Sequence, residues 1–353
     1  MHEEKREQAP GSRRIYRRRM TLNQNRRTTL KQIQKKSTAP FIVLMFVLTV
    51  IQVAMGQHSH PQKAAKPTPA NAAKTGVLLL AHGGKPEWNN EVKNLATQVN
   101  GTLPVEVAFG MASKRNMDEA IRRLIARGVQ QIIAVPLFVS SHSSVITSTE
   151  YLLGLRAKAP PELAVFARMD HAHGGSSHAM TMDASFDPTS PIKSPVPVQM
   201  TAALNRHPLV AEILLERARS ISKEPKSEVV VIVAHGPVSD DDNAKWLADM
   251  HSLVERMRGA GSFKLIEYLT VRDDAPEDVR ARATAELRTL VERGTGDGNR
   301  VLVVPLLLSY GGIELGIKKR LEGLSYTMSS QGLLPDKRLA EWVLLTSRDG
   351  GGN

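Results

Sequence analysis

Apolar runs of strand length alternate along the chain with longer stretches in which apolar residues recur at helical spacing. The apolar runs cover residues 76–81, 104–110 and 129–139, and helical stretches over 87–99 and 117–128 separate them. Continuous apolar strands that alternate with helices are typical of a parallel sheet covered on both faces. The pattern therefore predicts an α/β fold.

The next part of the chain predicts three further elements and a long loop. A helix is expected near residues 148–157, a strand over 163–169 and a helix over 201–221. Residues 169–200 are rich in Gly, Ser and Pro, a composition that indicates a loop.

From residue 228 the same order of elements returns. Strands are predicted over 228–236, 263–271 and 300–309, with helices over 240–259 and 275–294 between them. Two such units in tandem predict two Rossmann- or flavodoxin-like lobes, each with a parallel sheet, and a cleft between them. The predicted boundaries are 76–168 for the first lobe, 169–200 for the loop, 201–227 for a connecting helix and 228–347 for the second lobe.

The N-terminal region has the features of a leader followed by a linker. Residues 1–56 are basic and end in the apolar segment 40–56, which is shorter than the roughly 20 residues of a membrane-spanning helix. Its strict apolar core, residues 41–51, has the length of a signal-peptide core. The "NRRTTLK" stretch at 25–31 resembles a twin-arginine export signal, and residues 57–75 form a Pro/Ala/Lys linker. A cleaved signal, an uncleaved membrane anchor and a chance apolar stretch all stay open, and the first two predict a periplasmic or membrane-anchored protein.

Composition and charge exclude several classes of function. The net charge is +12, but residues 1–36 carry +9 of it, so the folded part is nearly balanced and nucleic-acid binding is not expected. Aromatic residues make up only 4% of the chain, too few for a base-stacking surface. The chain has no cysteine, which excludes disulfides, iron–sulfur clusters and thiolate metal sites. Any metal must therefore be bound by His, Asp, Glu or Met.

Two histidines stand at the ends of predicted strands. His82 and His235 each follow an apolar run and an alanine, and each precedes a glycine. Open parallel sheets bind ligands beyond the carboxyl ends of their strands. These two imidazoles are therefore candidate ligands for a metal.

A second candidate follows the "VPL" strand of each half. His142 comes after "VPLFVSS", and Glu314 comes after "VPLLLSYGGI". Each half thus offers a pair of ligand-type residues, His82 with His142 and His235 with Glu314. Imidazole nitrogen and carboxylate oxygen suit divalent Co, Ni, Fe and Zn.

The duplicated motifs "LLLAHGG…VPLFVSSHS" and "VIVAHGP…VPLLLSYGGIE" resemble those of the sirohydrochlorin cobaltochelatase (CbiX/SirB) family of class II tetrapyrrole chelatases. The resemblance covers roughly residues 76–345. It implies that His82 and His142 hold the metal and assist its insertion into sirohydrochlorin or a related tetrapyrrole. The metal, Co²⁺ foremost and otherwise Ni²⁺ or Fe²⁺, is then a substrate, and no organic cofactor is expected.

The chain departs from the family pattern at the second position. The family spacing puts this histidine at Ser144, two residues beyond His142, and Ile313 takes the corresponding place in the second half. Because the second half lacks a histidine at this place, we expect the second lobe to form the opposite wall of the cleft and the first lobe to carry the catalytic residues.

The substrate carboxylates of a tetrapyrrole call for cationic groups at the rim. Lys85, Lys114 and Arg115 lie in predicted loops after the first two strands. His207, before Pro208, is expected on the cleft wall. Three histidines and two methionines of the 169–200 loop form a further candidate metal cluster, namely His171, His173, His178, Met180 and Met182.

A second interpretation belongs to a different class of protein. In it the chain is a non-catalytic exported protein that binds a metal or a tetrapyrrole on a chelatase fold. The shifted His142 and the missing histidine of the second half favour this interpretation, and the histidines of the loop would supply its ligands.

Overall fold

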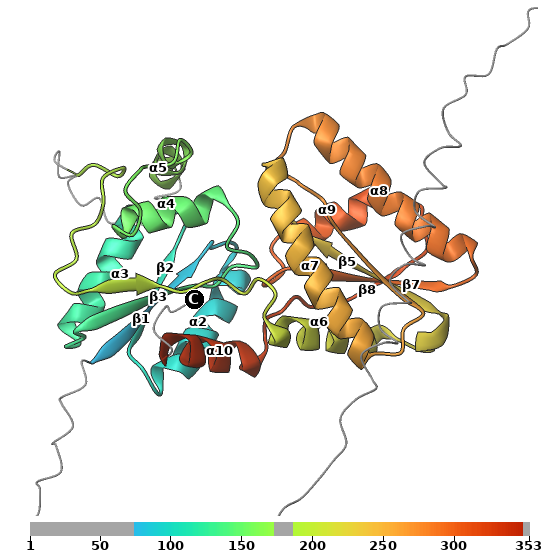
Figure 1. Cartoon of the computed structure of the whole chain (residues 1–353), viewed down its shortest axis with the longest axis horizontal. Helices are drawn as coiled ribbons and strands as arrows, with labels where there is room; N and C mark the ends of the chain where they lie inside the picture. Colours follow the sequence, from blue (N-terminus) through green and yellow to red (C-terminus); the bar gives the residue numbers. More distant parts are fainter. Residues whose placement is uncertain (1–73, 173–185, 349–353) are drawn as a thin grey trace, which may run out of the picture. The chain divides into compact units, whose positions relative to one another are not determined.

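The computed structural model describes residues 74–172 and 186–348 (Figure 1). The predicted leader and residues 57–73 of the predicted linker lie outside these residues, as do His173, His178, Met180 and Met182 of the predicted metal cluster. Thr75, predicted as the end of the linker, is the first residue of a strand. Across the two described ranges, no helix is both long and apolar enough to cross a membrane.

The first sheet is parallel throughout and has the strand order β2-β1-β3-β4. Its strands are β1 (Thr75–Ala81), β2 (Val105–Phe109), β3 (Gln131–Pro136) and β4 (Val198–Met200). Strand β1 is therefore an inner strand with β2 on one side and β3 on the other. The prediction of an α/β fold with a parallel sheet is confirmed.

Helices cover both faces of this sheet because successive β1 side chains alternate between two apolar clusters. Val77 and Leu79 pack in the cluster that contains α2 (Pro86–Asn100). Leu78 and Leu80 pack in the cluster that contains α3 (Lys114–Ala126) and α4 (Ser144–Leu152). Full burial on both faces explains why β1 is apolar at every position from 76 to 81.

Two predictions in this half of the chain are wrong in detail. The strand predicted over 163–169 is a helix, α5 (Leu163–Ala172), and its buried side chains Leu163, Phe166 and Ala167 recur at helical spacing. The predicted loop over 169–200 is shorter at both ends, because α5 continues into it and β4 closes it. Strand β4 has only three residues and no apolar run of its own, so periodicity gave no signal for it.

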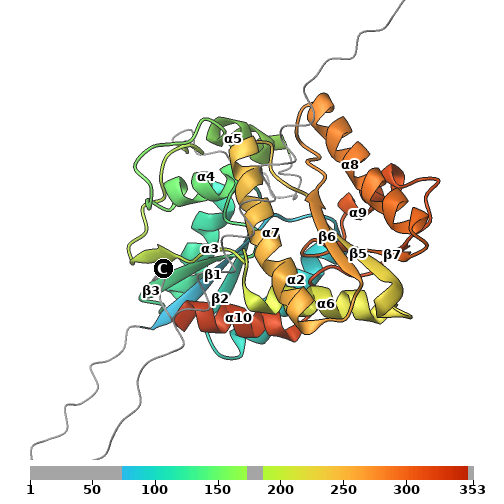
Figure 2. The ribbon, with the colours of Figure 1, turned by 45° about the vertical axis from the view of Figure 1, so that its right-hand side comes forward.

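The second sheet repeats the arrangement with the order β6-β5-β7-β8. Its parallel strands are β5 (Glu228–Ala234), β6 (Leu265–Thr270), β7 (Arg300–Leu306) and β8 (Thr327–Met328). Even-numbered β5 side chains, such as Val230 and Ile232, pack in the same cluster as residues of α6 (Pro208–Ile221) and α7 (Asp240–Ala260). Odd-numbered ones pack in the cluster of α8 (Glu277–Gly296) and α9 (Ile313–Arg320), so α7 and α8 flank this sheet (Figure 2).

The helix predicted over 201–221 begins later, at Pro208. Residues 201–207 remain extended or turning because they continue from β4 along β3. The Thr201 N–H donates to the Ala134 carbonyl at 3.0 Å, and the Leu204 N–H donates to the Phe138 carbonyl at 3.1 Å. A proline at the first helical position then starts α6.

The two halves share one apolar cluster. Side chains of β1, α2, β5 and α7 belong to it, together with Leu339 and Val343 of the last helix, α10 (Lys337–Arg348). Helix α10 lies within the predicted second lobe by sequence, yet it contacts α2 and β3 of the first sheet. The chain therefore returns to the first half at its end.

A buried carboxylate anchors the start of β5. Glu228 is 1% exposed, and it accepts hydrogen bonds from the Ser222 hydroxyl, the Lys223 N–H (2.9 Å) and the Arg300 guanidinium (2.7 Å). Burial alone raises the pKa of Glu228, but these three bonds outweigh it and hold the pKa below its ordinary value.

We expect Glu228→Gln to lower the free energy of unfolding at pH 7 by about 2 kcal/mol, because it removes charge-assisted hydrogen bonds at a buried site. A carboxyl whose folded pKa is depressed contributes stability above its unfolded pKa of about 4.3 and loses it as the pH falls further. Urea denaturation between pH 7 and pH 3 should show a shallower pH dependence in the variant. Glu267→Gln, which removes the exposed ion pair with Arg293, is the control, and an equal loss there would contradict this assignment.

Candidate active site

His82 directly follows the last residue of β1. The turn there depends on Gly83, whose φ of +82° lies in the left-handed region. The exposed imidazole places Nδ1 2.7 Å from the Gly83 carbonyl oxygen. Because a carbonyl can only accept, Nδ1 carries the proton in this hydrogen bond, and Nε2 of the neutral ring presents its lone pair outward. That lone pair can bind a metal or accept a proton.

His142 lies beyond the carboxyl end of the neighbouring strand β3. Strands β1 and β3 pair in register from Thr75 with Gln131 to Leu80 with Pro136, and the Leu137 N–H donates to the Leu80 carbonyl at 2.8 Å. His82 and His142 therefore both lie at the carboxyl edge of the first sheet, where parallel sheets bind ligands.

The loop that carries His142 is fixed on two sides. The Ser141 N–H donates to Asn205 Oδ1 at 2.7 Å, and Asn205 Nδ2 donates to the Ser141 hydroxyl at 3.1 Å. On the other side, the Trp246 indole N–H of α7 donates to the His142 carbonyl at 2.8 Å. Helix α4 then begins immediately after Ser143, whose side chain caps it, so the predicted start near 148 is four residues late. These contacts hold the backbone of His142 in place.

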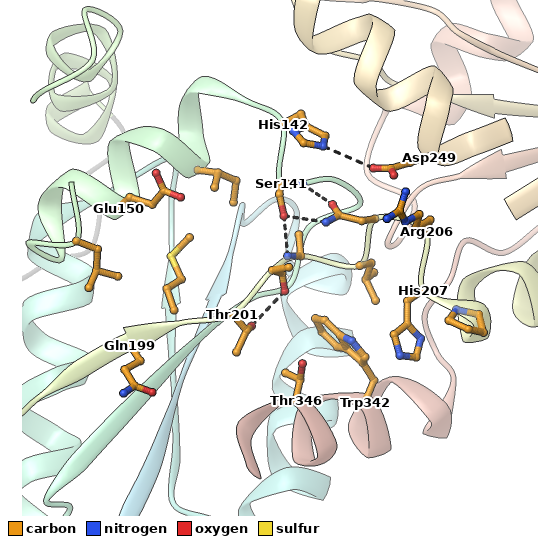
Figure 3. Close-up of a pocket in the computed structure, with 18 of the residues that line it drawn as sticks. Ser141, His142, Glu150, Gln199, Thr201, Arg206, His207, Asp249, Trp342 and Thr346 are labelled. Atoms are coloured by element: carbon orange, nitrogen blue, oxygen red, sulfur yellow. Dashed lines mark hydrogen bonds and ion pairs between the residues drawn. The ribbon is translucent and has the colours of Figure 1, made fainter. Parts of the chain in front are cut away.

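A cavity of about 1160 Å³ opens beside this loop (Figure 3). Residues 199–208, from the end of β4 onward, form one wall, and α7 and α10 contribute Asp249 and Trp342. The lining combines apolar side chains with charged and polar ones. Its cationic side chains are Arg156, Arg206 and Arg256, its carboxylates are Glu150 and Asp249, and its imidazoles are His142 and His207.

The imidazole of His142 points toward Asp249 of α7 (Figure 3). His142 Nε2 and Asp249 Oδ2 are 3.8 Å apart, and the two side chains are 36% and 15% exposed. Asp249 Oδ2 is buried and has no hydrogen-bond partner among the described residues. Burial raises the pKa of Asp249, and the positive charges of His142 and Arg206 offset only part of that rise.

His207 lines the same cavity and caps α6. Its Nδ1 accepts a hydrogen bond from the Leu209 N–H at 3.3 Å, so Nδ1 is unprotonated in this arrangement. Burial lowers the pKa of His207, while Glu212 raises it and Arg256 lowers it further. The structure thus places His207 on the cavity wall with a neutral ring.

In the second half, the two predicted metal ligands, His235 and Glu314, contact different groups. His235 follows β5, and its Nε2 lies 3.5 Å from Asp274 Oδ2 in the loop after β6. Glu314 is 9% exposed, and it accepts hydrogen bonds from the Gly311 and Gly312 N–H groups at 3.1 and 2.8 Å. Its carboxylate therefore satisfies the free N–H groups at the start of α9.

Within the described ranges, no three His, Asp or Glu side chains come together in a way that could hold a metal ion. His82, His235 and Glu314 do not line the cavity that contains His142.

Lys114 was predicted to offer its charge to the substrate at the rim, but its ammonium is bonded within the protein. Its ammonium donates to the Asp187 carbonyl and the Ser190 hydroxyl, both at 2.7 Å, and lies 5.0 Å from the centre of the Phe186 ring. Arg115 lies over the same ring at 5.3 Å. Both side chains hold the segment after residue 185 against α3, whereas Lys85 is exposed.

Asp249 and Trp246 are not among the candidate residues that the sequence suggests. The apolar spacing along α7 could have indicated them, because the inward side of this helix is formed by Trp246, Met250, Leu253 and Met257. The acidic Asp249 directly adjoins these apolar positions. An acid beside an apolar stripe indicates either a buried partner or a functional carboxylate.

Solved structures with a similar fold are two forms of the chelatase SirB from Bacillus subtilis. The form with Fe³⁺ has a TM-score of 0.52 at 17% identity, and the match covers 79% of this chain and 96% of that one. The sirohydrochlorin chelatase SirB of subspecies spizizenii, in complex with cobalt, has a TM-score of 0.50 at 14% identity and covers 79% and 95%. The duplicated lobes with strand-end histidines thus define a protein of the chelatase fold.

The model of the CbiX family matches residues 76–221, a range that contains both His82 and His142. The sirohydrochlorin cobaltochelatase of Methanosarcina acetivorans is 30% identical over 89 residues, which are 24% of this chain and 68% of that protein. The enzyme of the same name from Methanothermobacter thermautotrophicus is 34% identical over 85 residues, 23% of this chain. The chain belongs to the CbiX family. It spans 59% of the Methanothermobacter protein and 55% of the one from Sulfolobus acidocaldarius.

Proposed function

We propose that this protein is a chelatase that inserts a divalent metal, Co²⁺ foremost, into sirohydrochlorin or a related tetrapyrrole. One observation carries the proposal: the region that matches the CbiX family holds His82 and His142 just beyond the carboxyl ends of two paired strands. Co²⁺ is preferred because cobalt stands in the names of the relatives, and Ni²⁺ and Fe²⁺ are the alternatives.

The reaction exchanges two pyrrole N–H protons for one metal ion. His82 Nε2, with its lone pair directed away from the Gly83 hydrogen bond, serves first as metal ligand. Once the ion has passed to the macrocycle, the same nitrogen accepts one pyrrole proton, and water takes the other. His142 serves as the second metal ligand. Two imidazoles on neighbouring strand ends bind a divalent ion loosely enough to release it, because an incomplete ligand set leaves the remaining positions to water and substrate.

The cavity beside His142 supplies the substrate contacts. Its volume of about 1160 Å³ is slightly above the roughly 300–1,000 Å³ of most small-molecule sites, as a macrocycle requires. Arg156, Arg206 and Arg256 offer forked donors for the peripheral carboxylates. The second lobe acts here as a wall, through α7.

The location that we propose is outside the cytoplasm. The basic region and apolar segment within residues 1–56 support export or membrane anchoring, and the 57–75 linker would separate the leader from the folded part. The membrane would then contact the protein only through its N-terminal segment.

Steady-state metal insertion tests the proposal. The full chain is mixed anaerobically with sirohydrochlorin and Co²⁺, Ni²⁺ or Fe²⁺, and the metallated product is followed by absorbance. We expect the rate with at least one ion, Co²⁺ first, to exceed the spontaneous rate. Rates equal to the spontaneous ones for all three ions would overturn the proposal, and would favour a binding protein if Co²⁺ or sirohydrochlorin still bound.

A further inference from the structure

The carboxylate of Asp249 is placed in an unusual environment. Its Oδ2 is buried in the cavity wall with no hydrogen-bond partner among the residues that the structure describes, and it faces the His142 imidazole at 3.8 Å. A buried carboxylate oxygen without a partner loses its hydration and gains nothing in return. Such an atom is expected where a ligand completes its contacts.

The distance between the two side chains is informative. At 3.8 Å, His142 Nε2 and Asp249 Oδ2 are too far apart for a hydrogen bond, which requires about 3.2 Å or less. Two ligand atoms that each lie about 2.1 Å from one tetrahedral ion are separated by about 3.4 Å. A small closing movement would therefore bring both atoms to bonding distance of the same divalent cation.

The backbone that carries His142 is anchored, in part by the helix that carries Asp249. The Trp246 indole N–H, one turn before Asp249 on α7, donates to the carbonyl of His142 itself. Asn205 holds the preceding residue of the loop through two hydrogen bonds. Metal ligands on anchored backbone lose little freedom on binding.

The charges around the pair allow a cation between them. Besides His142, Arg206 is the positive side chain that lowers the pKa of Asp249, and the described residues show no ion pair between Arg206 and Asp249. Glu150 adds a second carboxylate to the cavity lining. The alternative is a simple ion pair of protonated His142 with Asp249, in which no metal takes part.

We propose that His142 Nε2 and Asp249 Oδ2 together bind the divalent metal substrate on the cavity wall before the ion reaches His82, with water completing its coordination at this first position. The second lobe then contributes a ligand, in addition to forming a wall. This inference deepens the proposed function and rests on it for the role of the ion. Imidazole and carboxylate without thiolate suit Co²⁺, Ni²⁺ and Fe²⁺.

Co²⁺ binding to the full chain, without any tetrapyrrole, tests this site. Wild type, Asp249→Asn, His142→Ala and the double variant are titrated anaerobically, with visible absorbance and equilibrium dialysis as readouts. We expect each single variant to bind the ion at this site about tenfold or more weakly, since even outer-shell substitutions weaken metal binding by that factor. The double variant should lose little beyond either single one, because both ligands serve one ion.

Asp241→Asn, an exposed acid on the first turn of the same helix, is the matched control and should bind Co²⁺ like the wild type. Asp249→Glu, which keeps the carboxylate, should retain part of the affinity, and circular dichroism checks that each variant folds. Wild-type affinity in Asp249→Asn, or additive losses in the double variant, would overturn the site. Since no tetrapyrrole is present, this result is independent of whether the protein catalyses insertion.

Discussion

Replacement of His82 by alanine is expected to slow Co²⁺ insertion into sirohydrochlorin by about a hundredfold or more, the usual contribution of a positioned acid–base group. The imidazole is exposed, and its one hydrogen bond is to the adjacent Gly83 carbonyl. Its removal therefore leaves the apolar clusters on either side of β1 unchanged. Thermal unfolding of the variant should coincide with that of the wild type.

His235→Ala is the matched control for this prediction. His235 occupies the corresponding place after β5, but its imidazole faces the Asp274 carboxylate and it lies outside the range that matches the CbiX family. We expect this variant to keep most of the wild-type insertion rate. If His82→Ala retained wild-type activity, or if both variants lost it equally, the assignment of the reaction to the first lobe would be wrong.

Arg217→Met is expected to cause the largest loss of stability, about 3 kcal/mol in the free energy of unfolding. Arg217 of α6 is 8% exposed, and its guanidinium donates to the carbonyls of Gly332 (2.9 Å), Leu333 (3.4 Å) and Pro335 (3.2 Å). It also lies 3.9 Å from the Asp336 carboxylate. The variant leaves these buried acceptors unsatisfied although methionine fills part of the space.

The loss of stability in Arg217→Met should extend to the first lobe. The segment that Arg217 binds leads directly into α10, which packs against α2 and β3. Hydrogen exchange should therefore show faster exchange in α10 of the variant, alongside the shift in urea denaturation. Arg219→Met, two residues further along α6, removes only an exposed hydrogen bond to the Ala260 carbonyl and should cost less than about 1 kcal/mol. Equal losses in the two variants would contradict the special role of Arg217.

The duplicated α/β architecture could be predicted from sequence because β1, β3, β5 and β7 are buried on both faces. Such strands are apolar at nearly every position, and their spacing repeats in the two halves. Short elements could not be predicted in this way. Strand β4 pairs with β3 over three residues, and α5 begins with the same kind of apolar run as a strand.

Of the candidate site, only the residues that directly follow a strand could be predicted from the sequence. His82 and His142 lie where the sequence places them, at the carboxyl edge of the first sheet. Asp249 reaches His142 from a helix of the second half, 107 positions later in the chain, so only the tertiary structure brings them together. Glu314 shows the converse: its sequence position suggests a ligand, but local N–H groups at the start of α9 occupy its carboxylate.

A single-turnover measurement tests the central claim most directly. The full chain, in excess over sirohydrochlorin, is preloaded with Co²⁺ and mixed anaerobically with the tetrapyrrole, and metallation is followed by stopped-flow absorbance. The account predicts a first-order conversion that is faster than the reaction with free Co²⁺ at the same concentration, and that disappears in His82→Ala. Conversion at the rate of free Co²⁺ in wild type and variant alike would contradict it.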